Sequence, residues 1–146
     1  MDKKLALESI GKIVEISAGV NGNYIGQLVN ILPGAGIVAV VKILACIKYP
    51  GQRAVFYKSN SFERWPFYYG AIETCHIDCI DIYYGAILEY YDIMPKVLAE
   101  TFLIETEADR EIYTRHQAYW AQPEKDHTEL PPFMGKRMNI PRKRAD

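Results

Sequence analysis

Apolar and polar residues alternate, or apolar β-branched residues cluster, through the first half of the chain. Residues 12–17 place Val14 and Ile16 on one face of an extended segment, with Glu15 and Ser17 on the other. Turn-forming pairs separate the segments that follow, at Asn21-Gly22, Pro33-Gly34 and Pro50-Gly51. We predict strands at 12–17, 24–32, 37–47, 53–57 and 67–77. Strands this short and evenly spaced are typical of a small β-barrel.

The spacing of apolar residues becomes helical after Tyr84. Proline is accepted in a first helical turn, so we predict a helix that starts at Pro95 and presents Val97, Leu98, Phe102 and Leu103. A second helix is predicted after Thr106, which with Asp109 three residues later resembles a capping box. We expect its apolar face to pack on the barrel, through Ala108, Ile112, His116, Tyr119 and Trp120.

These patterns define a mainly β fold with an α extension, a small barrel followed by one or two C-terminal helices. We predict the barrel over residues 1–92, the helical extension over 93–122, and a flexible, Pro-rich basic tail over 123–146. A chain of 146 residues suits one domain with appendages, and its 49% apolar and 24% charged residues are ordinary for globular proteins.

The net charge of −1 hides an uneven distribution along the chain. Residues 1–72 carry eight Lys and Arg against four Asp and Glu, whereas residues 73–111 carry two against ten. The last fourteen residues carry five against one, including Lys136, Arg137 and Arg142-Lys143-Arg144. This pattern argues against a chain-wide nucleic-acid footprint, but the tail is basic enough for weak contact with an anionic surface.

The N-terminal residues lack the apolar core of a signal peptide, and the apolar stretch from Ile31 to Ile47 is interrupted by Pro33, Gly34 and Lys42. It is also shorter than the roughly 20 apolar residues that a membrane-spanning helix needs. Three cysteines, an odd number, favour reduced thiols over a disulfide scaffold. We therefore expect a cytoplasmic protein, associated with a membrane only through a partner.

The segment Cys75-His76-Ile77-Asp78-Cys79 is the strongest metal-like cluster, because thiolate and imidazole suit zinc. On a strand, however, Cys75 and Cys79 would lie about 13 Å apart at about 3.3 Å per residue, too far to bind one ion. We expect these cysteines to be structural, and we keep a reactive thiol as the alternative. No nucleophile or phosphate motif accompanies them. The sequence thus predicts no metal, no cofactor and no enzymatic activity.

Eleven tyrosines are many for this length. Neighbouring residues of a strand face opposite ways, so the pairs Tyr68-Tyr69 and Tyr83-Tyr84 cannot all point inward. Tyrosine is common at interfaces because it combines a large rigid surface with a polar tip. We predict a protein-binding surface formed by Tyr24, Tyr57, Tyr68, Tyr69, Tyr83 and Tyr84. The alternative is that these rings fill the barrel ends and keep their hydroxyls in water.

Five segments in the same order resemble the kinase-associated protein B family of spore-forming bacilli. They are Gly22–Gln27, Pro33, Val41–Gln52, Phe62–Arg64 and Tyr84–Tyr90, so the resemblance covers roughly residues 10 to 105. The resemblance implies an SH3-like barrel with a helical extension, and a role in supporting a membrane-bound sensor histidine kinase of the sporulation phosphorelay. The chain departs from the family pattern at residues 53–56, where it reads Arg-Ala-Val-Phe.

Three functions remain open from the sequence. The first is a non-catalytic protein-interaction module whose partner is a protein such as a sensor histidine kinase. The second is a nucleic-acid-binding small barrel, motivated by the basic residues of 1–72 and of the tail, although no specific nucleic acid is expected. The third is a metal- or thiol-dependent enzyme built on Cys75, His76 and Cys79. An exposed barrel edge or second-helix face could also form a homodimer.

Overall fold

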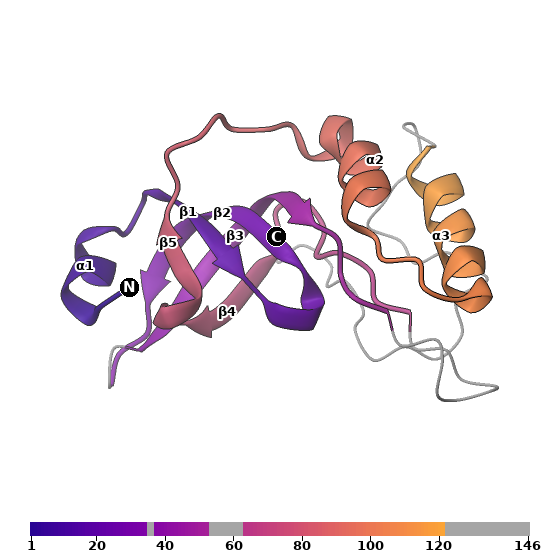
Figure 1. Cartoon of the computed structure of the whole chain (residues 1–146). Helices are drawn as coiled ribbons and strands as arrows, with labels where there is room; N and C mark the ends of the chain where they lie inside the picture. Colours follow the sequence, from indigo (N-terminus) through magenta and orange to yellow (C-terminus); the bar gives the residue numbers. More distant parts are fainter. Residues whose placement is uncertain (35–36, 53–62, 122–146) are drawn as a thin grey trace.

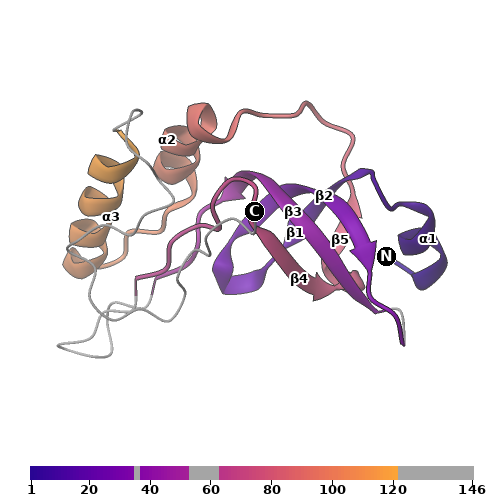
Figure 2. The ribbon, with the colours of Figure 1, turned by 180° about the vertical axis from the view of Figure 1, so that it is seen from behind.

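The computed structural model describes residues 1–34, 37–52 and 63–121. Five antiparallel strands form one curled sheet in the order β4-β3-β2-β1-β5. The strands are β1 (Ile13–Ser17), β2 (Asn23–Ile31), β3 (Val38–Lys48), β4 (Ile72–His76) and β5 (Ile80–Ile82). Figures 1 and 2 show this sheet at one end of the molecule and two helices side by side at the other. The predicted small SH3-like barrel with a helical extension is confirmed.

Three α-helices and two 3-10 turns complete the described fold. They are α1 (Lys3–Glu8), α2 (Tyr90–Thr101), α3 (Glu107–Trp120), η1 (Gly19–Asn21) and η2 (Ile77–Cys79). Asp2 caps α1, since its side chain accepts a hydrogen bond from the Leu5 N–H. η2 is the short link between β4 and β5, the two outer strands of the sheet.

The strand predicted over residues 67–77 is too long. Only residues 72–76 form β4, because Tyr68–Ala71 is a tight turn closed by a hydrogen bond from the Ala71 N–H to the Tyr68 carbonyl. Gly70 takes a φ of +81° in this turn, a conformation that other residues rarely adopt. β5 and α1 were not predicted, and the strand predicted over residues 53–57 lies outside the described residues.

The first long helix begins five residues earlier than predicted, at Tyr90, and Pro95 lies inside it. Glu89 caps this helix by accepting a hydrogen bond from the Tyr91 N–H at 3.3 Å. The helix starts there because burial follows the helical period from its first residue, through Tyr90, Met94, Val97 and Leu98. The predicted division into residues 1–92, 93–122 and 123–146 stays a prediction.

A single core runs from the barrel into the helices. Inward residues of the strands, such as Val14, Leu28 and Ile43, are fully buried. The buried face of α2 joins the same cluster, and α2 packs on β3. The ring of Tyr90 is buried there, and its hydroxyl donates to the Phe67 carbonyl at 2.6 Å. The extension therefore shares the barrel's core instead of resting on its surface.

The predicted reversal at Asn21-Gly22 is present, as η1 followed by Gly22. Gly22 has a φ of +96°, and an added Cβ would lie 2.5 Å from the backbone oxygen of Lys48. Because both the backbone conformation and the contact oppose a side chain, Gly22→Ala is expected to lower the free energy of unfolding by about 1–3 kcal/mol. Urea denaturation measures this loss.

Gly51→Ala is the matched control for Gly22→Ala. The nearest atom to a Cβ at Gly51 is the Val20 carbonyl oxygen at 3.9 Å, and its φ lies outside the positive range. Its stability should change by less than about 1 kcal/mol. Equal losses in the two variants would contradict the close approach of Gly22 to β3.

Candidate protein-docking site

The helix α3 is anchored to the barrel by a buried chain of hydrogen bonds. The indole N–H of Trp120 donates to the Tyr49 hydroxyl at 2.8 Å. The Tyr49 hydroxyl lies 2.7 Å from Nδ1 of His116, whose Nε2 lies 3.2 Å from the Glu63 carboxylate. Arg115 makes an ion pair with the other oxygen of Glu63. Tyr49 follows β3 directly, so this network connects α3 to the end of the longest strand.

The donor order of this network fixes the proton on His116. The Glu63 carboxylate can only accept, so Nε2 of His116 carries the proton. In the neutral ring Nδ1 then accepts from the Tyr49 hydroxyl, whose oxygen accepts from the indole N–H of Trp120. Burial lowers the pKa of His116, so the ring is neutral at pH 7. For Glu63, burial favours the neutral form, but the hydrogen bonds from His116 and Arg115 outweigh it and lower its pKa. Every polar group in the network is therefore paired.

The inner face of α3 matches most of the prediction. Ile112, His116, Tyr119 and Trp120 are buried, and the capping box of Thr106 and Asp109 is present. The predicted packing on the barrel is only partly correct. The face meets α2 and the segments that leave the sheet, where Trp65 stacks on His116 with ring centroids 3.8 Å apart and Tyr49 contacts the same ring. α3 thus covers the barrel's extensions, since α2 already occupies the position next to β3.

A groove of about 770 Å³ lies where the barrel meets the helices. One wall is the β1–β2 turn with Val20, and the other is the α2–α3 turn with Leu103. Val20 is 59% exposed and Leu103 is 74% exposed, so both walls offer apolar surface to solvent. Lys48, Glu105 and Asp109 add one basic and two acidic side chains to the lining. The groove thus combines exposed apolar walls with charged side chains, as protein interfaces do.

Hydrogen bonds donated by backbone N–H groups hold the walls of the groove in place. The Tyr49 N–H donates to Oγ1 of Thr101 at 2.8 Å, which ties the floor to the end of α2. The Gly51 N–H donates to the Val20 carbonyl at 2.9 Å, which ties it to the β1–β2 turn. A surface fixed before a partner arrives loses little conformational freedom on binding. The groove is therefore preorganised.

The six predicted tyrosines do not form one surface. Tyr24 and Tyr68 are 0% and 1% exposed, so their placement on a docking surface is wrong. The hydroxyl of Tyr24 keeps hydrogen-bond partners although the ring is buried, since it donates to the Asn21 carbonyl and accepts from the Phe67 N–H. Tyr69 and Tyr83 are half-buried, and Tyr84 is 90% exposed. Tyr57 lies outside the described residues.

Sequence reasoning missed the two exposed apolar residues of the groove. Leu103 was placed on the predicted helix at helical spacing, but α2 ends at Thr101 and Leu103 is 74% exposed. Val20 is an apolar residue in a turn between glycines, and this placement was the one local signal of an exposed contact. The two come together only through tertiary packing, so no spacing in the chain reveals the groove.

Cys75 and Cys79 are both half-buried and reduced, and Cys46 is buried. Burial and the neighbouring Cys79 raise the pKa of Cys75 to about 11, so its thiol is protonated at neutral pH. Among the described residues, no three His, Cys, Asp or Glu side chains are arranged to hold a metal ion. The structure thus gives the reactive-thiol and zinc alternatives no geometric support in this segment.

Comparison with solved structures finds a protein that is similar over most of its length. A crystal structure of kinase-associated protein B from Bacillus cereus is 27% identical, with a TM-score of 0.54, and the match covers 82% of this chain and 97% of that one. The chain has a kinase-associated protein B-like fold. The strands end at Ile82, little more than half-way along the chain, so the match must continue into the helical extension.

The likeness to kinase-associated protein B is one of structure. No family model matches the chain, and no curated protein matches it. The similarity therefore supports the barrel and its helices directly, and any role beside a kinase is a matter for proposal. In the described ranges, no helix has the length and apolar character needed to cross a membrane.

Proposed function

We propose that the chain is a non-catalytic interaction module that binds and assists a kinase. The observation that carries the proposal is the preorganised groove between Val20 and Leu103, on a fold like that of kinase-associated protein B. The sequence resemblance extends the proposal to a membrane-bound sensor histidine kinase, whose cytoplasmic part the module would bind. On this view the protein associates with a membrane only through its partner.

The lining of the groove indicates the kind of surface it accepts. Exposed apolar side chains at the centre of an interface contribute most of the binding energy, and charged edges set orientation. Val20 and Leu103 would contact apolar side chains of a kinase segment, with Lys48 and Glu105 at the edges. We therefore propose an amphipathic segment of the kinase as the occupant.

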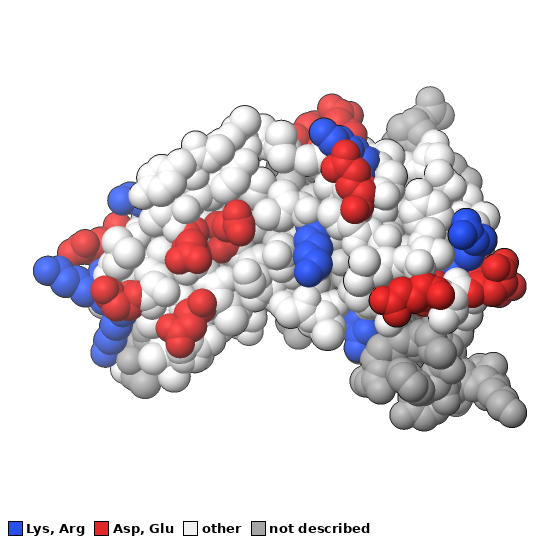
Figure 3. Space-filling view, in the orientation of Figure 1, with Lys and Arg blue, Asp and Glu red and all other residues white. Residues whose placement is uncertain are grey.

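The charges on the face that Figure 3 shows do not favour the nucleic-acid alternative. On that face, Lys and Arg side chains are interspersed with Asp and Glu over both the barrel and the helices. A nucleic-acid footprint needs basic side chains gathered along one face. The basic tail lies outside the described residues, so its weak contact with an anionic surface stays a prediction.

Replacing both apolar wall residues should weaken kinase binding. Val20→Asp with Leu103→Asp places a charge on each wall of the groove, and we expect at least about a tenfold loss of affinity. The full chain would be tested against the purified cytoplasmic parts of the sensor histidine kinases of the same organism, by calorimetry and by the rate of kinase autophosphorylation.

Val29→Asp is the matched control for the groove variant. Val29 is 43% exposed on β2, outside the residues that line the groove, so the substitution replaces an exposed apolar residue with aspartate elsewhere on the barrel. It should leave kinase affinity unchanged. The proposal is refuted if none of the kinases binds the wild-type chain, or if the groove variant binds as well as the control.

A further inference from the structure

The strand β4 lies at one edge of the sheet. It pairs with β3 on one side, and no other strand of the described chain pairs with its outer side. The opposite edge of the sheet is β5, which pairs with β1. A cavity of about 550 Å³ lies between β4 and the β1–η1 segment, so the curled sheet stays open beside β4.

The hydrogen bonds to β3 show which backbone groups of β4 face outward. Ala71, just before β4, accepts from β3 at 2.9 Å, and Ile77, just after it, donates to the residue that precedes β3 at 2.9 Å. In an antiparallel pair the bonded positions recur at every second residue. The N–H and C=O groups of Ile72, Thr74 and His76 therefore point away from β3.

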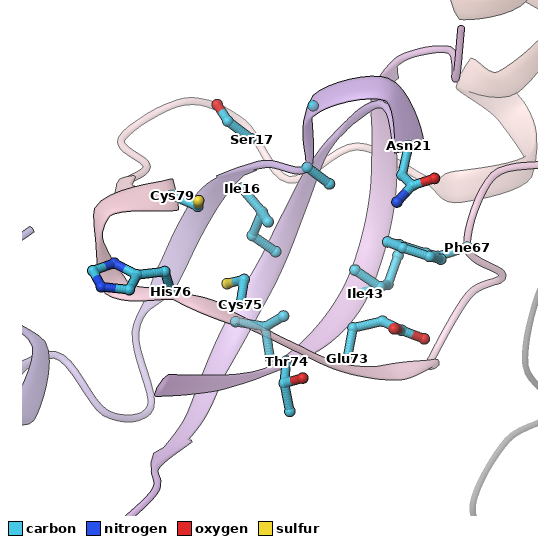
Figure 4. A pocket seen from close by; sticks show the side chains of 13 residues that line it. Ile16, Ser17, Asn21, Ile43, Phe67, Glu73, Thr74, Cys75, His76 and Cys79 are labelled. Carbon is cyan, nitrogen blue, oxygen red and sulfur yellow. The ribbon is translucent and has the colours of Figure 1, made fainter. Parts of the chain in front are cut away.

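The side chains at these three positions lie on the outer face of the sheet. Ile72, Thr74 and His76 are exposed, whereas Glu73 and Cys75 are half-buried. Figure 4 shows the side chains of Glu73 and Cys75 on one side of β4 and that of Thr74 on the other. A strand added at this edge would therefore meet outer-face side chains and leave the core in place.

The two edges of the sheet differ in how well they can accept another strand. Natural edge strands avoid pairing through lysine, proline, bulges or a very short length. β4 has five residues, contains neither lysine nor proline, and pairs with β3 without a register shift. β5 has only three residues, with an exposed aspartate, Asp81, at its centre. β4 is therefore the edge that can pair.

We infer that β4 pairs with β4 of a second copy of this chain, antiparallel and centred on Thr74. In this register Thr74 opposes its counterpart, and Ile72 opposes His76 of the second copy. The outward N–H and C=O groups then meet, because each of these opposed positions forms a hydrogen-bonded pair that exchanges two bonds. The same patch is used on both copies, as a two-fold dimer requires.

The charges beside the edge are complementary in the same register. Lys42 of β3 is aligned with Ile72, and the Asp78 carboxylate lies 3.4 Å from the imidazole of His76. Because Ile72 opposes His76 of the second copy, Lys42 lies two strands, or about 10 Å at about 4.8 Å per strand, from the residue that holds Asp78. A lysine side chain can span most of that distance. The two-fold axis repeats this attraction on the other side of Thr74.

These features favour a second copy over an unrelated strand. A strand of another protein could use the same backbone groups, but the symmetric bonding positions and the charges of Lys42 and Asp78 match β4 itself. Two five-residue strands make a small contact compared with the about 1,200–2,000 Å² of stable interfaces, so we expect a weak, reversible dimer. The dimer goes beyond the proposed function, because the groove lining includes no residue of β4.

Sedimentation of the full chain tests the dimer. Wild type should pass reversibly from monomer to dimer between about 10 µM and about 1 mM, the range of a small interface. Thr74→Lys and Thr74→Glu should each weaken dimerisation at least about fivefold, because like charges would lie directly opposite each other. An equimolar mixture of the two variants should dimerise again, since opposite charges then meet. This recovery also shows that both variants fold.

Thr114→Lys is the matched control, because Thr114 is an exposed threonine on α3, far from β4 in the chain. Its dimerisation should match wild type. A wild-type chain that stays monomeric at about 1 mM would overturn the inference. So would a loss of dimers in Thr114→Lys equal to that in Thr74→Lys, or a mixture of the Thr74 variants that does not recover.

Amide hydrogen exchange tests the register. The amides of Ile72, Thr74 and His76 should exchange at least about threefold more slowly at about 1 mM than at about 10 µM, because only the dimer protects them. If these amides are protected only when a kinase is added, the edge accepts a strand of the kinase and the inference is wrong. The groove variant with Val20→Asp and Leu103→Asp should dimerise normally, so failure of the dimer and failure of kinase binding are separate results.

Discussion

Replacing Trp65 with alanine is expected to lower the free energy of unfolding by about 3–5 kcal/mol. Trp65 is 2% exposed and stacks on the His116 ring at a centroid distance of 3.8 Å. It also contacts Tyr119 edge-on and Trp120 at a tilted angle. Its removal opens a cavity beneath α3 and exposes the network of His116 to water. Chemical denaturation followed by far-ultraviolet circular dichroism measures the loss.

Tyr84→Ala is the matched control for Trp65→Ala, because it also removes a large aromatic ring. Tyr84 is 90% exposed, so its stability should stay within about 0.5 kcal/mol of wild type. Equal stability of the two variants would contradict this account, since α3 would then be held without the aromatic contacts of Trp65.

Acid is expected to destabilise the protein below about pH 6.5, the ordinary pKa of the His116 side chain. Burial lowers the pKa of His116 in the folded state, so the unfolded chain binds the proton first as the pH falls. Stability should decline by up to about 1.4 kcal/mol per pH unit in this range. The lowered pKa of Glu63 acts in the same direction at lower pH, because below about pH 4.5, the ordinary pKa of glutamate, the unfolded chain binds this proton before the folded carboxylate does.

His116→Gln tests the source of this pH dependence. Glutamine offers an acceptor and a donor but does not titrate, so the variant should be less stable than wild type at pH 7.5. That deficit should shrink as the pH falls toward 5, because only the wild type loses the histidine contribution. Urea denaturation at several pH values measures the difference. A deficit that stays constant across the range would show that His116 does not titrate on unfolding.

The sequence predicts much of the fold because its strongest signals are local. The alternation in residues 12–17 and the capping box at Thr106 depend on neighbours within a few positions, and both are confirmed. β5 spans three residues and α1 spans six, too short for a period to emerge. The turn at Tyr68–Ala71 was missed because its aromatic residues favour strands, while Gly70 decides the backbone path.

The candidate site was harder to predict, because residue type alone does not determine exposure. Tyr24 was assigned to a surface because of its chemistry, yet it is buried where Asn21 and Phe67 satisfy its hydroxyl. Those partners are known only from the folded chain. Val20 and Leu103 lie far apart in the sequence and line the same groove only in the folded chain, where α2 packs on β3.

Hydrogen exchange of the full chain, with and without a bound histidine kinase, tests the docking site most directly. We predict that the kinase slows exchange in residues 18–23 and 101–109, which form the two walls of the groove, and leaves the outer part of β2 around Val29 unchanged. Protection confined to that outer surface, with none at either wall, would contradict the account.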